Sequence, residues 1–156
     1  MLNWSAEDLA HHLEGSGLER QRATRILAIL HRIKGDFGRF DLQGLGQLDP
    51  SAAEAYLTSL PGVGLKTAKC VQLFSLGTAV LPVDGHLLRV ARRLKLLPRG
   101  LSRDRSERRL EALVPAKLRR AFHINAITLG REVCRPVRPR CEECPLVSLC
   151  PFPLAG

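Results

Sequence analysis

A lysine suited to nucleophilic attack and a carboxylate suited to its electrostatic support lie at the two ends of a short segment in the middle of the chain. Lys66 follows the turn Pro61-Gly62-Val63-Gly64, and Asp84 lies eighteen positions further on. The turn runs into a helical pattern, and the N-terminus of a helix carries free N–H groups that bind phosphate. The expected donors here are Gly62, Gly64 and Leu65. A positive charge is disfavoured at such a helix end, and a nucleophilic lysine must be neutral.

Each residue of this pair has a competing interpretation. Asp84 precedes a helix expected over residues 85–94, and a carboxylate at that position is a good helix cap without any chemistry. Lys69 lies one turn after Lys66 on the same helix face, so geometry alone makes it a rival nucleophile. Cys70 lies on an apolar face, which is more typical of a small buried hydrophobe than of a catalytic thiol.

Four cysteines near the C-terminus have the spacing of metal ligands. They form a C-x6-C-x2-C-x5-C run interleaved with prolines, and they are Cys134, Cys141, Cys144 and Cys150. Soft thiolates that converge from short loops suit a metal. Disulfides are the alternative, and a chain without a visible export signal disfavours them. Zinc and an iron-sulfur cluster both accept four thiolates, so the spacing alone leaves both open.

The positive charge of the chain is concentrated in one segment. The 156 residues have a formal net charge of +9, yet residues 1–88 carry 8 Lys/Arg against 9 Asp/Glu, whereas residues 89–140 carry 16 against 4. This is the electrostatic footprint of a polyanion-binding protein, and an Arg-rich surface that only aids solubility is the alternative. The expected phosphate ligands are Arg105, Arg108, Arg109, Arg119 and Arg120.

Helical periodicity dominates the rest of the sequence. It predicts helices over residues 6–14, 19–34, 50–59, 66–76, 85–94, 101–113 and 115–132, with a short extended crossing over residues 78–83. The fold class is therefore all-α. Leu18 stands at the start of the second helix, where it is either a hydrophobic staple or an exposed wedge. No apolar run is long enough to span a membrane, and we expect a cytoplasmic protein.

Three signatures together resemble endonuclease III, of the helix-hairpin-helix DNA glycosylase superfamily. They are the hairpin LPGVGLKTA with its Lys66, the sequence VDGH with its Asp84, and the four-cysteine run. The resemblance extends from about Gly15 to the end of the chain. It implies a helix-hairpin-helix DNA glycosylase fold with a partial six-helix barrel, divided into a hairpin lobe over residues 1–80 and a lobe over residues 81–156 that ends in a [4Fe-4S] loop. It also favours an iron-sulfur cluster over zinc.

The resemblance further implies a base-excision-repair enzyme, a DNA N-glycosylase with abasic-site (AP) lyase activity on oxidised pyrimidines. Lys66 would form a Schiff base with the sugar, and Asp84 would stabilise the cationic sugar and assist proton transfers. Leu18 matches a residue that wedges into DNA. The expected partner is double-stranded DNA with damaged bases or abasic sites, bound by a monomer in the bacterial cytoplasm, associated with the nucleoid and not with a membrane.

Two features depart from the family pattern. Gly85 stands where the family usually has threonine, next to Asp84. In addition, family members begin with several further helices, so the chain is expected either to continue upstream or to be a shortened protein with an incomplete barrel. The alternative function is a non-catalytic or weakly active DNA-binding remnant of the family. A zinc-stapled helical protein of unrelated role is a third possibility.

Overall fold

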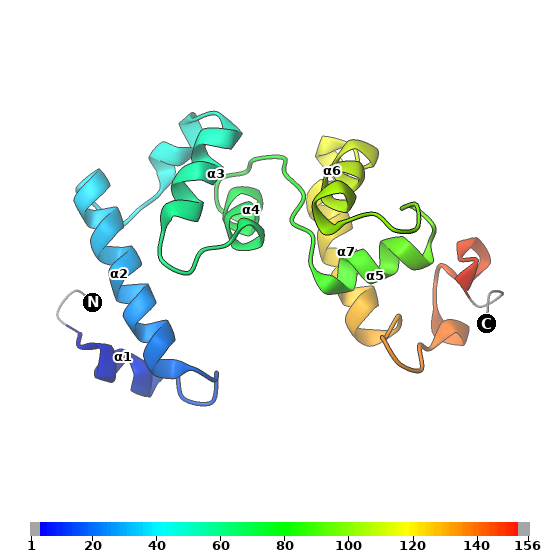
Figure 1. The fold of residues 1–156 in the computed structure, drawn as a ribbon, viewed down its shortest axis with the longest axis horizontal. Coiled ribbons are helices and arrows are strands. Elements are labelled where there is room, and N and C mark those ends of the chain that lie inside the picture. The colour runs from blue at the N-terminus through cyan, green and yellow to red at the C-terminus, as the bar shows by residue number, and fades with distance from the viewer. Residues whose placement is uncertain (1–3, 153–156) are drawn as a thin grey trace. The chain divides into compact units, whose positions relative to one another are not determined.

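The structure is a computed structural model that describes residues 4–152, and in this part of the chain it contains helices and loops but no strand (Figure 1). This confirms the all-α prediction. The α-helices are α1 (Ala6–His12), α2 (Glu19–Phe37), α3 (Pro50–Ser59), α4 (Leu65–Phe74), α5 (Gly85–Arg93), α6 (Arg103–Leu113) and α7 (Arg119–Glu132). The 3₁₀ helices are η1 (Gln43–Gln47), η2 (Ala116–Leu118), η3 (Cys141–Glu143) and η4 (Val147–Leu149). Among the described residues, no helix is long and apolar enough to cross a bilayer.

Helix ends differ from the sequence-based boundaries in two instructive places. α2 continues through Gly35 and ends at Phe37, and Gly38 follows with φ 70° as a left-handed C-cap. Only the residue at the C-cap needs a left-handed backbone. Gly35 lies before the cap, so the helix accommodates it in its interior. The predicted helix over residues 115–132 is also divided. Pro115 has an extended ψ of 139°, so it caps the 3₁₀ turn η2, and α7 begins only at Arg119.

The chain folds into two compact units that divide within α4, between Ala68 and Lys69. The family resemblance predicts a boundary further along the sequence, between lobes over residues 1–80 and 81–156. That division stays a prediction. In the first unit, α1 packs against α2. Its buried apolar residues come from several of its helices and include Ala10, Ala23, Ile33, Leu45, Ala53 and Leu57.

In the second unit, α5 packs against α7, and the core forms around both. The core residues come from the extended segment 78–83, from α5 and from the elements after it; they are Leu81, Val83, Leu87, Leu88, Ala91, Leu97, Leu110, Val114 and Ala126. Residues 80–83, directly ahead of Asp84, are buried and so belong to the core and not to a surface loop.

Candidate functional site

The hairpin of the first unit is a type II turn. The Val63 N–H donates to the Leu60 carbonyl at 3.1 Å, Pro61 occupies the second position, and Gly62 takes φ +76° at the third. A type II turn favours proline at its second position and glycine at its third, where φ is positive. The sequence supplies both residues in that order. A Cβ on Gly62 would also lie 2.7 Å from Cδ of Arg25. The exposed side chain of Arg25 can move away from such a Cβ, so Gly62 is required by its backbone conformation.

The fold does not require glycine at position 64, because Gly64 is not a left-handed residue and a Cβ there would meet nothing within 4 Å. Its carbonyl accepts the Ala68 N–H of α4 at 3.0 Å. Within residues 4–152, the N–H groups of Gly62, Gly64 and Leu65 have no acceptor. The hairpin thus presents open backbone donors at the start of α4, the arrangement that binds a phosphate.

The structure distinguishes the two candidate lysines on α4. Lys66 is exposed in the first turn. Lys69 is only 9% exposed, and its Nζ lies 3.5 Å from Glu111 Oε2 and 3.8 Å from Glu107 Oε2. An ammonium held between two carboxylates is a structural ion pair and a poor nucleophile. Lys66 is therefore the better candidate, and it is also the lysine that the family resemblance favours.

Asp84 caps α5 and is half-buried. Its Oδ1 accepts the Leu87 N–H at 2.8 Å, whereas Oδ2 has no partner among the described residues. Capping and chemistry are thus compatible, because one oxygen fixes the carboxylate and leaves the other available. A Cβ on the following Gly85 would meet open space, so packing does not demand glycine there. Lys66 belongs to the first unit and Asp84 to the second, and their pairing in one site stays a prediction.

Leu18 is the residue that precedes α2, and it is 70% exposed. Its φ of 58° and ψ of 37° place it in the left-handed region, which costs a residue with a Cβ about 1 kcal/mol or more. The turn is held by the Gly17 N–H, which donates to Glu19 Oε1 at 2.8 Å. A large apolar side chain is therefore displayed on a strained backbone, which supports a wedge over a staple.

The predicted phosphate ligands fall into two groups. Arg105, Arg108 and Arg109 on α6 and Arg120 on α7 are exposed. Arg119 is different, because its guanidinium donates to the carbonyls of Val114 at 3.2 Å, Glu111 at 2.7 Å and Ala79. Structural contacts hold this arginine, so the four exposed ones are the stronger candidates for phosphate binding.

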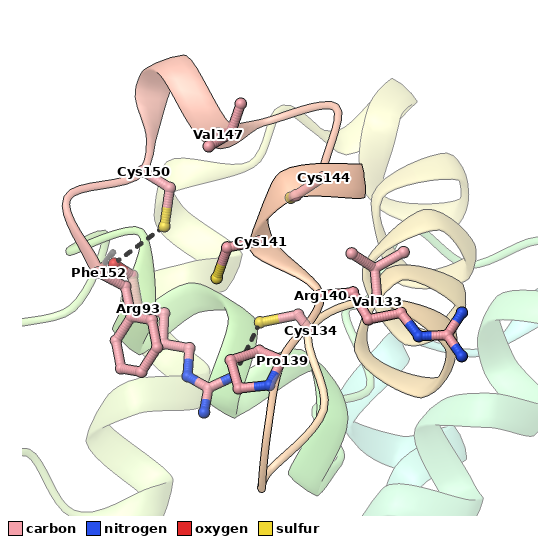
Figure 2. Close-up of a pocket in the computed structure, with 10 residues that line it drawn as sticks. All are labelled: Arg93, Val133, Cys134, Pro139, Arg140, Cys141, Cys144, Val147, Cys150 and Phe152. Atoms are coloured by element: carbon pink, nitrogen blue, oxygen red, sulfur yellow. Dashed lines mark hydrogen bonds between the residues drawn. The ribbon is translucent and has the colours of Figure 1, made fainter. Parts of the chain in front are cut away.

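The four C-terminal cysteines line one pocket, shown in Figure 2. All four are free thiols, and apolar residues surround them: Val133, Pro139, Val147 and Phe152. Arg93, at the end of α5, also lines the pocket. Its Nη1 donates to Cys134 Sγ at 3.2 Å, its carbonyl accepts from Cys150 Sγ at 3.7 Å, and its guanidinium lies 4.1 Å from the centre of the Phe152 ring.

This donor set fits an iron-sulfur cluster. Soft thiols from one short loop, an apolar surround and a cationic donor to a ligand sulfur are what such a cluster needs. Among residues 4–152, no group of three or more His, Cys, Asp or Glu side chains is arranged to hold a metal ion. The cluster itself stays a prediction.

No protein-family model matches the chain. The chain is 34% identical to the endonuclease III of Thermotoga maritima over 94% of its own length and 64% of that protein. It is 32% identical to DEMETER-like protein 2 of Arabidopsis thaliana over 86% of its own length and 11% of the plant protein. A solved non-covalent complex of endonuclease III with DNA matches with a TM-score of 0.80 and 28% identity, over 99% of this chain and 68% of that one.

The fold is thus that of the helix-hairpin-helix DNA glycosylases. Within this class the chain is similar to endonuclease III over nearly its whole length, which confirms the resemblance inferred from the three motifs. It spans about a tenth of the plant relative and somewhat less than two thirds of the bacterial one.

Three residues of these contacts were not predicted from the sequence: Glu107, Glu111 and Arg93. The only signal for the two glutamates in the sequence was their spacing of four residues on the otherwise Arg-rich α6, which places them side by side on that helix. Their partner Lys69 is far away in the sequence. Arg93 carried no signal, since it lies in a run of basic residues.

Proposed function

We propose that the chain is a DNA glycosylase with abasic-site lyase activity that removes oxidised pyrimidines from double-stranded DNA. The observation that carries this proposal is the exposed Lys66 in the first turn of α4, directly behind a glycine turn whose N–H groups are open. A nucleophile beside a phosphate-binding backbone is what an enzyme that attacks a nucleotide sugar needs.

DNA would be held without sequence readout. The hairpin N–H groups would bind one phosphate, and the exposed arginines of α6 and α7 would bind others by charge. Because chemistry at C1′ cannot occur inside the duplex, the damaged nucleotide would be turned out of the stack. The exposed Leu18 would fill the space that the nucleotide leaves.

Lys66 and Asp84 would then divide the chemistry. The neutral Nζ of Lys66 bonds to C1′ as the N-glycosidic bond breaks and the base departs, and ring opening gives a Schiff base. Loss of a C2′ proton then breaks the bond to the 3′ phosphate, which cuts the strand. The negative charge of Asp84, with Oδ1 fixed by the Leu87 N–H, stabilises the positive sugar, and Oδ2 is available for proton transfer.

The four cysteines would hold a [4Fe-4S] cluster. When bound, the cluster supplies four iron–thiolate bonds that tie the C-terminal loop together. Arg93 links this loop to α5 by donating to the carbonyls of Arg135 at 2.7 Å and Pro136 at 3.1 Å, in addition to Cys134 Sγ.

Borohydride trapping tests the enzyme. Reduction of the Schiff base should crosslink the protein to DNA that contains an abasic site or thymine glycol, and Lys66→Gln should abolish the crosslink while DNA affinity stays nearly unchanged. Lys69→Gln serves as the comparison, since it removes the other lysine of α4; its folded fraction should still form the crosslink. Intact DNA binding with no crosslink in the natural sequence would instead support a non-catalytic DNA-binding protein.

The metal can be identified separately. Protein purified without oxygen should be coloured, with absorbance at about 400 nm, because thiolate-to-iron charge transfer absorbs there. The variant Cys141→Ser should lose this absorbance. A colourless protein that contains one zinc per chain would refute the cluster and favour the zinc-stapled alternative.

A further inference from the structure

The extended segment over residues 78–83 is buried at its last four positions, yet it has no neighbouring strand within the described range 4–152. Leu81 and Val83 are fully buried. Buried backbone polar groups need partners, and here side chains of α6 and α7 provide them. Arg103 Nη2 donates to the Val83 carbonyl at 2.8 Å, and His123 Nδ1 donates to the Pro82 carbonyl at 2.8 Å. The backbone that leads into Asp84 is therefore fixed by side chains.

Glu111 lies at the centre of these contacts. Its Oε1 accepts the Leu81 N–H at 3.2 Å and lies 3.5 Å from Arg119 Nη1, while its Oε2 lies 3.5 Å from Lys69 Nζ. One carboxylate thus connects α4, the extended segment and α7. The neighbouring Glu107 lies 3.8 Å from Lys69 and 3.5 Å from Arg103, and neither of these partners belongs to the extended segment.

We infer that Glu111 is a positioning residue for Asp84. The inference rests on the proposed function, in which Asp84 supports the reaction. Leu81 is three residues before Asp84, and its buried N–H donates to the charged side chain of Glu111. Removing this acceptor would leave a buried donor unpaired, so the segment would have to shift toward water. A shift of about 1 Å in a reacting group can cost about a hundredfold in rate.

The alternative role of Glu111 is stability alone, through its charge. Two variants separate the roles. Glu111→Gln loses the charge but keeps an amide oxygen at the right length for the Leu81 N–H. Glu111→Asp keeps the charge but withdraws the carboxylate by one methylene. The long side chain of Lys69 can follow it, whereas the Leu81 N–H is fixed in the backbone.

The test measures single-turnover cleavage of thymine-glycol duplex DNA at saturating protein, together with the DNA dissociation constant and hydrogen exchange of the peptide over residues 78–84. Asp104→Asn, an exposed carboxylate on the same helix α6, is the control. For Glu111→Asp we expect a rate at least about tenfold lower at an unchanged dissociation constant, with faster exchange. Glu111→Gln should stay within about threefold of the natural protein, since its hydrogen bond is kept.

Equal rates and equal exchange in Glu111→Asp and the natural protein would overturn the inference and leave the proposed function standing. A larger rate reduction in Glu111→Gln than in Glu111→Asp would do the same, because charge and not reach would then matter. An inactive natural protein that forms no trapped complex would refute the proposed function, and the inference with it.

Discussion

The two hairpin glycines impose different constraints, and substitution can separate them. Gly62→Ala places a Cβ in the left-handed region and against Arg25, so it should cost about 1–2 kcal/mol. For a chain of this size, that lowers the melting temperature by about 2–4 °C per kcal/mol. Thermal unfolding followed by circular dichroism measures the change.

Gly64→Ala is the matched comparison. Its Cβ would enter open space at ordinary φ, so the melting temperature should not fall, but the methyl group would stand where a phosphate approaches the start of α4. We expect weaker binding to abasic-site DNA for this variant. Equal melting temperatures for the two variants would show that the turn does not need the positive φ of Gly62.

For individual residues, local spacing predicts the candidate site residues but not their surroundings in the fold. Lys66 and Lys69 share one helix face in the sequence, and only the three-dimensional structure shows that Lys69 is buried between carboxylates. Those carboxylates come from α6, so no local pattern connects them to Lys69. The left-handed conformation of Leu18 is equally invisible, because leucine has no preference for it.

At the scale of elements, a polar contact joins α2 to α3. Tyr56 OH donates to Asp36 Oδ2 at 3.0 Å, and the Phe37 and Tyr56 rings meet edge to face at 5.3 Å. Burial raises the pKa of Tyr56 above 10.0, and the bond to Asp36 raises it further. The Arg32 guanidinium, 2.6 Å away, holds the pKa of Asp36 below 3.8, with Tyr56 adding to the effect.

Tyr56 is the sole tyrosine of the sequence, so ultraviolet titration of phenolate absorbance reports on it alone. We expect an apparent pKa above 10.0. Asp36→Asn should lower that pKa part of the way, because burial, the larger cause, remains. Asp41→Asn, whose carboxylate pairs with Arg39, should leave it unchanged. An ordinary tyrosine pKa in the folded protein would contradict the contact.

The sign of the stability effect follows from the direction of the shift. Since folding raises the pKa of Tyr56, the stabilisation is fully present below pH 10.0 and is lost as the pH rises through the folded value. Tyr56→Phe should remove this alkaline dependence.

Helix existence was predictable from periodicity and helix boundaries were not. Every predicted helix overlaps an observed one, yet α2 passes through Gly35, and Pro115 caps a 3₁₀ turn where a helix start was expected. Glycine and proline are strong local signals, but each permits several conformations. The packing of α7 on α5 also lies outside any local window.

For the whole molecule, the uneven charge predicts how DNA affinity depends on salt. Replacing Arg105, Arg108 and Arg109 with glutamine should reduce the slope of log affinity against log salt by about 0.9 for each phosphate that the protein no longer neutralises. Arg119→Gln should instead lower the melting temperature, since its guanidinium holds three backbone carbonyls. Fluorescence anisotropy over a salt series measures the slope.

Arg39→Gln, in the balanced part of the chain, is the control for this series. If the triple α6 variant kept the full slope, the basic segment would be only a solvated surface. Composition locates the charged region as a block, but it could not separate the exposed arginines from Arg119, because burial depends on the packing of α6 and α7.

The left-handed backbone at Leu18 has an evolutionary consequence. Leu18→Gly would relieve the unfavourable dihedral angles and make the protein more heat-resistant, and it would remove the side chain that the proposed function inserts into the duplex. Selection for thermostability alone should therefore discard this leucine, whereas selection for repair should keep it. This trade-off between thermal stability and activity would be visible in two directed-evolution experiments on the same chain, one of which would lose Leu18 while the other would retain it.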